Sequence, residues 1–76
     1  MVEAFAMIST AAGMARSSLP EIQAIEGVKR ANIVAGEFDI IAIIEAESPQ
    51  ELLTLITDDV QSIEGVGRTR TNIVLE

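Results

Sequence analysis

Few residues in this chain have side chains that could act on a ligand or a substrate. The 76 residues include no Cys and no His. Thiol chemistry, thiolate metal sites and the commonest general base are therefore absent. No nucleophile is spaced with a base, and Gly65-Val66-Gly67 is too short to cradle a phosphate. These absences predict a protein that is not an enzyme and that holds no cofactor.

Carboxylates are the remaining candidates for a cation site. Asp58 and Asp59 are adjacent in a predicted helix, so their side chains point apart. Glu45 and Glu47 lie two residues apart near the end of a predicted strand, where they could share a face and chelate a cation. We expect this strand end to be solvated instead, and we predict no metal site.

Two polar segments are left to consider. The segment GEFD at 36–39 joins two predicted strands, where Gly can adopt positive φ and Asp can accept from backbone amides. The segment RTRT at 68–71 leads the last predicted strand, with both threonines on one face and both arginines on the other. Turn chemistry or strand propensity alone explains each segment taken singly.

The elements that must position these segments come in two similar halves. EIQAIEGVKRANIV at 21–34 returns as DVQSIEGVGRTRTNIV at 59–74, with Ile25 corresponding to Ile63 and Gly27 to Gly65. Each half reads as a strand, a helix and a second strand. The chain therefore predicts an α+β fold in one domain, residues 1–76. Its expected form is a ferredoxin-like βαββαβ unit with a four-stranded antiparallel sheet.

Capping residues and an apolar stripe define the second helix. Ser48 to Glu51 forms a capping box with Pro49 at the first helical position. A stripe at helical spacing follows: Leu52, Leu55, Ile56, Val60 and Ile63. In each IEGV copy we expect Ile to be the last buried helix residue, Gly the helix stop and Val the first residue of the next strand.

The first helix is harder to place because Pro20 interrupts its apolar stripe. We expect a helix over about residues 13–25 with a kink at this proline. The alternative is a helix that starts at Ser18, where Ser18 to Glu21 forms another capping box.

The first and third strands are apolar on both faces. Alternation separates Val2, Ala4, Ala6 and Ile8 from Phe5 and Met7, and it separates Ile40, Ala42 and Ile44 from Ile41 and Ile43. Two helices can cover one face only, so we expect a second subunit on the other. The predicted assembly is a dimeric α+β barrel paired sheet to sheet, with an interface of Phe5, Met7, Ile41 and Ile43.

Charge limits the partners of the chain. Four of the five cations, Lys29, Arg30, Arg68 and Arg70, fall on the expected edge strands, where they discourage pairing with other strands. The net charge of −7 predicts no direct binding of nucleic acid. No apolar run is long enough to cross a membrane, and Glu3 stands where an export signal would be positive. We therefore expect a soluble cytoplasmic protein.

The two polar segments and the order of elements together resemble the ligand-binding, or RAM, domain of the Lrp/AsnC (feast/famine) regulators. The resemblance covers essentially the whole chain. Its most specific parts are the G-x-x-D turn at 36–39 and the G-V-x-R-T-x-T run at 65–71. The N-terminal helix-turn-helix domain of those regulators is missing, so their DNA binding is not carried over. Pro20 inside the first helix is unusual for the family.

The resemblance implies a stand-alone module for effector binding and oligomerisation, able to mix with full-length regulators. Dimers packed sheet to sheet would join into rings of about eight subunits, with amino-acid effectors in clefts between dimers. The implied cleft residues are Gly36, Glu37, Phe38 and Asp39, with Thr69 and Thr71 nearby. Amides around Gly36 would hold a carboxylate and Asp39 would accept from an ammonium group. A purely structural role of Asp39 in its turn is the alternative.

Two other functions remain open. Small dimeric α+β barrel enzymes share this subunit plan, although such enzymes commonly use His. An ACT-like amino-acid-binding regulatory domain is also βαββαβ, but it pairs its subunits side by side. Face-to-face packing of the sheets would count against that interpretation.

Overall fold

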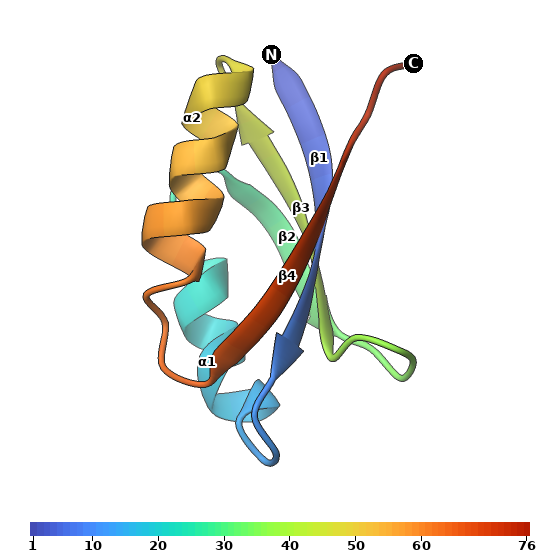
Figure 1. Cartoon of the computed structure of the whole chain (residues 1–76), viewed down its shortest axis with the longest axis vertical. Helices are drawn as coiled ribbons and strands as arrows, with labels where there is room; N and C mark the ends of the chain where they lie inside the picture. Colours follow the sequence, from blue (N-terminus) through green and yellow to red (C-terminus); the bar gives the residue numbers. More distant parts are fainter.

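The computed structural model describes residues 1–76 and confirms the ferredoxin-like βαββαβ plan. Its elements are β1 (Val2–Thr10), α1 (Ala15–Gln23), β2 (Val28–Ile33), β3 (Ile40–Ala46), α2 (Pro49–Thr54), the π-helical segment η1 (Leu55–Val60) and β4 (Val66–Ile73). The strands form one antiparallel sheet in the order β2-β3-β1-β4, and both helices lie on the same side of it (Figure 1). No helix is long and apolar enough to cross a membrane.

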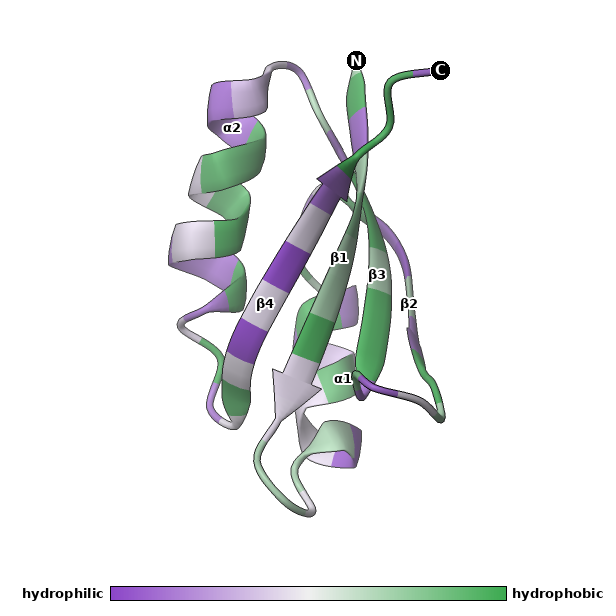
Figure 2. Ribbon diagram, turned by 45° about the vertical axis from the view of Figure 1, so that its right-hand side comes forward, coloured by the Kyte–Doolittle hydropathy of each residue, from purple (hydrophilic) through white to green (hydrophobic).

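The central strands β1 and β3 divide their side chains between two environments, as the alternation predicted. The side chains under the helices are fully buried: Ala4, Ala6, Ile8, Ile40, Ala42 and Ile44. They pack with Ile22, Leu52 and Val60 in one hydrophobic core. On the opposite side Phe5 is 44% exposed. We call this second side the open face. Figure 2 shows that β3 is mostly hydrophobic and that hydrophilic bands alternate along the edge strand β4.

Helix α1 runs through Pro20, so the expected helix across this proline is confirmed and the alternative start at Ser18 is wrong. The helix is shorter than expected because Gly13, at φ +78°, precedes it and the first IEGV turn follows it. Ser18 does not cap a helix end. It is fully buried in the middle of α1, and its hydroxyl donates to the carbonyl oxygen of Glu64 at 3.0 Å.

Helix α2 begins as predicted but ends differently. The hydroxyl of Ser48 accepts from the amide of Glu51 at 3.2 Å, which is the predicted cap. After Thr54 the chain widens into the π-helix η1, which the sequence did not indicate. The helical residues end at Val60, so Gly65 is not the helix stop. It lies in the turn that leads into β4.

The repeated IEGV sequence forms the same turn twice. The amide of Val28 donates to the carbonyl of Ile25 at 3.1 Å, and that of Val66 to Ile63 at 3.2 Å. Gly27 and Gly65 adopt positive φ of 102° and 94°, a conformation that costs glycine little. The two valines start β2 and β4, as expected. The isoleucines do not end the helices as predicted, because Ile25 and Ile63 lie beyond them and are only partly buried, and Gly27 lies in the turn after α1. The repeat is therefore a structural device that turns the chain from a helix into an edge strand.

Candidate functional site

Asp39 is hydrogen-bonded to the end of β1. Its Oδ2 accepts from the amide of Thr10 at 2.8 Å and from the Thr10 hydroxyl at 3.3 Å. The Asp39 amide donates to the carbonyl of Ile8 at 3.0 Å. These contacts hold the connection between β2 and β3 against the central strand, with one carboxylate oxygen left for other partners.

The rest of the 36–39 turn splits into buried and exposed parts. Phe38 is buried, whereas Gly36 and Glu37 are exposed. Gly36 does not adopt positive φ, so that part of the turn argument was wrong. A Cβ at Gly36 would meet nothing within 4 Å. Glycine is therefore not required by the fold at this position.

A cavity of about 300 Å³ opens beside Asp39. It is lined by Thr10, Ala11, Ala12, Gly13, Ala15, Arg16, Ile33 and Asp39. Its only charged residues are Arg16 and Asp39, which have opposite signs. Ile33, 43% exposed, adds an apolar wall. A small molecule that carries a cation, an anion and a short apolar group would find a matching surface for each part here.

Thr69 and Thr71 lie on the helix side of β4, and the arginines between them point to the open face, as alternation predicted. The register shows this, because Thr69 is opposite Ile8 and Arg70 is opposite Met7. The Thr69 hydroxyl accepts from Gln61 Nε2 at 2.9 Å. Gln61 directly follows the π-helix, so η1 and β4 are joined at this hydrogen bond.

The two predicted halves of the site do not meet within one subunit. Asp39 precedes β3 and Thr69 is on β4, and β1 lies between these strands. Two strand spacings correspond to about 10 Å. Of the six predicted cleft residues, only Asp39 lines a cavity. A site that uses both halves would need more than one subunit.

The four residues predicted for the dimer interface lie together on the open face. Phe5 is opposite Ile43 and Met7 is opposite Ile41 in neighbouring strands. A groove of about 270 Å³ lies over this face and is lined by Phe5, Arg30, Asn32, Val34, Ile41 and Ile43. The subunit thus presents a continuous apolar centre to solvent on the side that no helix covers.

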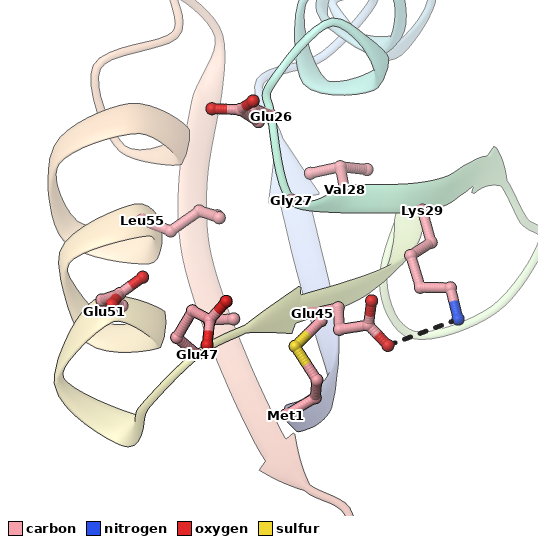
Figure 3. Close-up of a pocket in the computed structure, with 10 residues that line it drawn as sticks. Met1, Glu26, Gly27, Val28, Lys29, Glu45, Glu47, Glu51 and Leu55 are labelled. Atoms are coloured by element: carbon pink, nitrogen blue, oxygen red, sulfur yellow. Dashed lines mark ion pairs between the residues drawn. The ribbon is translucent and has the colours of Figure 1, made fainter.

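The largest cavity, about 560 Å³, lies at the opposite end of the sheet and is acidic (Figure 3). Four glutamates line it, Glu26, Glu45, Glu47 and Glu51. The chelating pair suggested by the sequence does not form on one strand face, because β3 ends at Ala46. Glu45 instead pairs with Lys29 at 3.6 Å. No three acidic side chains are placed to hold a metal ion.

Thr10 and Arg16 were missed by the sequence reasoning. In the sequence Thr10 looks like the ordinary end of a strand. Its neighbours give no indication that Asp39, 29 residues away, will bind it. Arg16 carried one usable signal, because it is the only cation outside the edge-strand segments. Its position beside Asp39 depends on the path of the connection between β1 and α1.

Comparison with known proteins identifies the family. The family model for the Lrp/AsnC ligand binding domain matches residues 3–76. An uncharacterized HTH-type transcriptional regulator of Pyrococcus horikoshii is 33% identical over 58 residues, which are 76% of this chain and 39% of the regulator. The chain therefore spans about two fifths of that regulator's length.

Two further relatives differ in length. A solved protein of Thermus thermophilus is 26% identical with a TM-score of 0.95, covering 100% of this chain and 95% of its own. The homocitrate synthase of Sulfurisphaera tokodaii is 34% identical over 55 residues, 72% of this chain but only 12% of the synthase. The same small domain thus occurs in chains of very different length. The protein described here belongs to the Lrp/AsnC ligand-binding domain family.

Proposed function

We propose that this domain binds a small amino acid in the cavity beside Asp39 and assembles with copies of itself through the open face of its sheet. Membership of a family of regulatory ligand-binding domains gives the class of function. The observation that carries the proposal is the cavity of about 300 Å³ with one carboxylate, one guanidinium and an apolar wall. A free amino acid has the complementary three parts.

Each charged residue has a defined task in this proposal. Thr10 occupies Oδ2 of Asp39, which leaves Oδ1 to accept from the ligand's ammonium group. Arg16 would bind the ligand's carboxylate with its guanidinium fork. This differs from the expectation that amides around Gly36 hold the carboxylate, since Gly36 does not line the cavity. Ile33 would contact the ligand's side chain.

Assembly would complete the site. An open cavity on one subunit gains enclosure if a neighbouring subunit covers it, and enclosed sites bind small ligands better. We propose that Gly36, Glu37 and Phe38 from the turn, and Thr69 and Thr71 from another subunit, contribute at this boundary. Dimers would join into a closed ring of about eight subunits, as the family resemblance implies, and closed point-group symmetry is the rule for soluble homo-oligomers.

The proposed role is regulatory rather than catalytic. The cavity offers no nucleophile paired with a base, and its charged groups suit recognition. The match to homocitrate synthase covers only 12% of that enzyme, which agrees with a domain attached to catalytic machinery rather than part of it. Full-length regulators with a similar domain are proposed as further partners, because like surfaces would allow mixed oligomers.

A thermal-shift screen against the twenty amino acids tests the ligand. A ligand at a hundredfold excess over its dissociation constant stabilises by about 2.7 kcal/mol, which raises the melting temperature of a small domain by roughly 10 °C or more. Asp39→Asn should abolish the shift while keeping an oxygen for Thr10. Glu21→Gln removes the same charge at an exposed position of α1 that does not line the cavity, and it should keep the shift.

The controls separate the outcomes. An equal shift in wild type and Asp39→Asn would place the ligand elsewhere and contradict the assignment. No shift with any amino acid would remove the ligand from the proposal and leave assembly as the function. Sedimentation of the Asp39→Asn variant would check that it is still oligomeric.

A further inference from the structure

The pairing of β1 with β4 is irregular next to the cavity of the proposed site. The register shifts between Ile8 and Thr10. Across this shift two residues of β4, Gly67 and Arg68, lie opposite Ser9 alone. Such a β-bulge interrupts the regular ladder and changes the direction in which neighbouring groups point, and bulges are common next to functional sites. The group that this bulge aims is Thr10, the last residue of β1.

The hydroxyl of Ser9 bridges the bulge. It accepts from the backbone amide of Arg68 at 2.9 Å and donates to the backbone carbonyl of Arg68 at 3.1 Å. A hydroxyl has one proton to donate and lone pairs with which to accept, so it can serve both backbone groups at once. The side chain of Ser9 thus joins β1 to β4 at the position where the regular ladder is interrupted.

Thr10 is bonded on one side, and its two neighbours are bonded on the other. Ser9, before it, is bonded to β4. The amide of Ala11, after it, donates to the carbonyl of Gly65 at 2.8 Å in the turn that leads into β4. Between these neighbours Thr10 donates its amide at 2.8 Å and its hydroxyl at 3.3 Å to Oδ2 of Asp39. With both neighbours held, Thr10 has little freedom to rotate about the axis of the strand.

The orientation of the Asp39 carboxylate depends on Thr10. The last torsion of an aspartate side chain has no sharply preferred value, so an unbonded carboxylate can turn. The bonds from Thr10 fix Oδ2 and thereby set the direction of Oδ1, the oxygen proposed to accept from the ligand's ammonium group. A group that is already oriented costs less to order when a ligand binds, so the affinity is higher.

Ser9 itself does not line the cavity, whereas Thr10 and Asp39 do. Any effect of Ser9 on a ligand there must therefore pass through Thr10. We infer that Ser9 is a positioning residue of the site. Its bonds to Arg68 hold the bulge and thereby Thr10, and Thr10 orients the Asp39 carboxylate toward the cavity. This inference rests on the proposed function for the identity of the ligand, and it adds the residue that prepares the site for it.

Hydrogen exchange of single amides, followed by NMR in the wild type and in Ser9→Ala, tests the positioning without any ligand. Loss of the hydroxyl should loosen the end of β1 locally, so the Thr10 amide should exchange about tenfold faster or more. The control amide is that of Glu45, which donates to the Gly27 carbonyl at 2.8 Å beside the first IEGV turn. Its exchange should change by less than about twofold, because local opening leaves distant bonds intact.

Two further variants show whether the hydroxyl and its location matter. Ser9→Thr keeps the hydroxyl, and the neighbouring Gly67 has no side chain to obstruct the added methyl group. The exchange of the Thr10 amide should then stay as in the wild type. Ser62→Ala removes another exposed hydroxyl, one that donates to the backbone carbonyl of Asp59 at 2.9 Å. This control should also leave the Thr10 amide unchanged.

Binding is measured in the same variants. The thermal-shift screen against the twenty amino acids is repeated, and calorimetric titration gives the dissociation constant of each amino acid that binds the wild type. Ser9→Ala should raise this constant about tenfold, which is the effect of losing roughly one well-placed hydrogen bond. Ser9→Thr and Ser62→Ala should leave the constant unchanged.

The inference would be overturned if the Thr10 amide exchanged at the same rate in Ser9→Ala as in the wild type, or if its exchange rose only in step with that of Glu45. Faster exchange of Thr10 with an unchanged dissociation constant would overturn it as well, because the site would then not depend on Thr10. If no amino acid binds the wild type, the proposed ligand is wrong. The exchange of the Thr10 amide still decides in that case whether Ser9 holds the bond between Thr10 and Asp39.

Discussion

The hydroxyl of Ser18 donates to the carbonyl oxygen of Glu64 across 3.0 Å and joins helix α1 to the second IEGV turn. Ser18 is the one polar side chain that is fully buried, so its hydroxyl is withdrawn from water and depends on this part-buried bond. The adjacent Gly65 packs so closely that an added Cβ would come within 2.9 Å of the same hydroxyl oxygen. The two halves of the repeat therefore lock together at this contact.

Ser18→Ala should lower the free energy of unfolding by about 1–3 kcal/mol, because the Glu64 carbonyl loses its buried partner. Urea denaturation at a fixed protein concentration measures the change. Ser17→Ala is the matched control, since Ser17 is exposed and its hydroxyl bonds only to Met14, three residues before it. The control should change stability by less than about 0.5 kcal/mol. Equal stability of the two variants would show that the contact does not hold the halves together.

Substituting alanine for three of the glycines should destabilise the protein to different extents. Gly36→Ala should be nearly neutral, because no atom lies within 4 Å of its added Cβ. Gly13→Ala should cost about 1–2 kcal/mol for its positive φ alone. Gly27→Ala should cost more, since its Cβ would also approach Leu55 Cδ1 at 2.7 Å. Thermal melting of the three variants checks this order, and a Gly27 variant as stable as the Gly36 variant would refute it.

Met7→Lys should dissociate the proposed dimer, because an ammonium group buried without a partner in an apolar interface is costly. Leu53→Lys is the control, since Leu53 is 62% exposed on α2 and lies away from the open face. Light scattering at micromolar concentration should give a monomer for the first variant and a dimer or larger species for the second. A wild-type monomer would contradict the assembly directly.

The domain by itself should not bind DNA. Its net charge is −7, and a duplex would be repelled rather than neutralised. A gel-shift titration at low salt, where electrostatic binding is strongest, should show no saturable complex. A saturable complex that weakens steeply with added salt would overturn this expectation.

The sheet and its two faces could be predicted because successive side chains of a strand point to opposite faces, and the sequence shows which residues share a face. Ala4, Ala6 and Ile8 alternate with Phe5 and Met7, and the structure places the first set under the helices. Likewise Ser48 caps α2 through a bond to Glu51, three residues away. Features set by neighbours in sequence were thus readable.

Features set by distant contacts were not readable. Ser18 looked like a helix cap, but its hydroxyl binds Glu64, 46 residues away. The π-helix η1 has no local signature, and its end is tied to β4 through Gln61 and Thr69. The cavity beside Asp39 likewise needs Thr10 and Arg16, which only the folded chain brings to that turn.

Sedimentation velocity with and without the amino acid found in the thermal screen tests most directly whether ligand site and assembly belong together. The measurement uses a dilution series that extends to concentrations where the free protein dissociates. If neighbouring subunits complete the site, linkage requires saturating ligand to stabilise the assembly and move its dissociation to lower protein concentration. The account would be contradicted if the amino acid raised the melting temperature but left the dissociation of the assembly at the same protein concentration. The site would then be complete within one subunit.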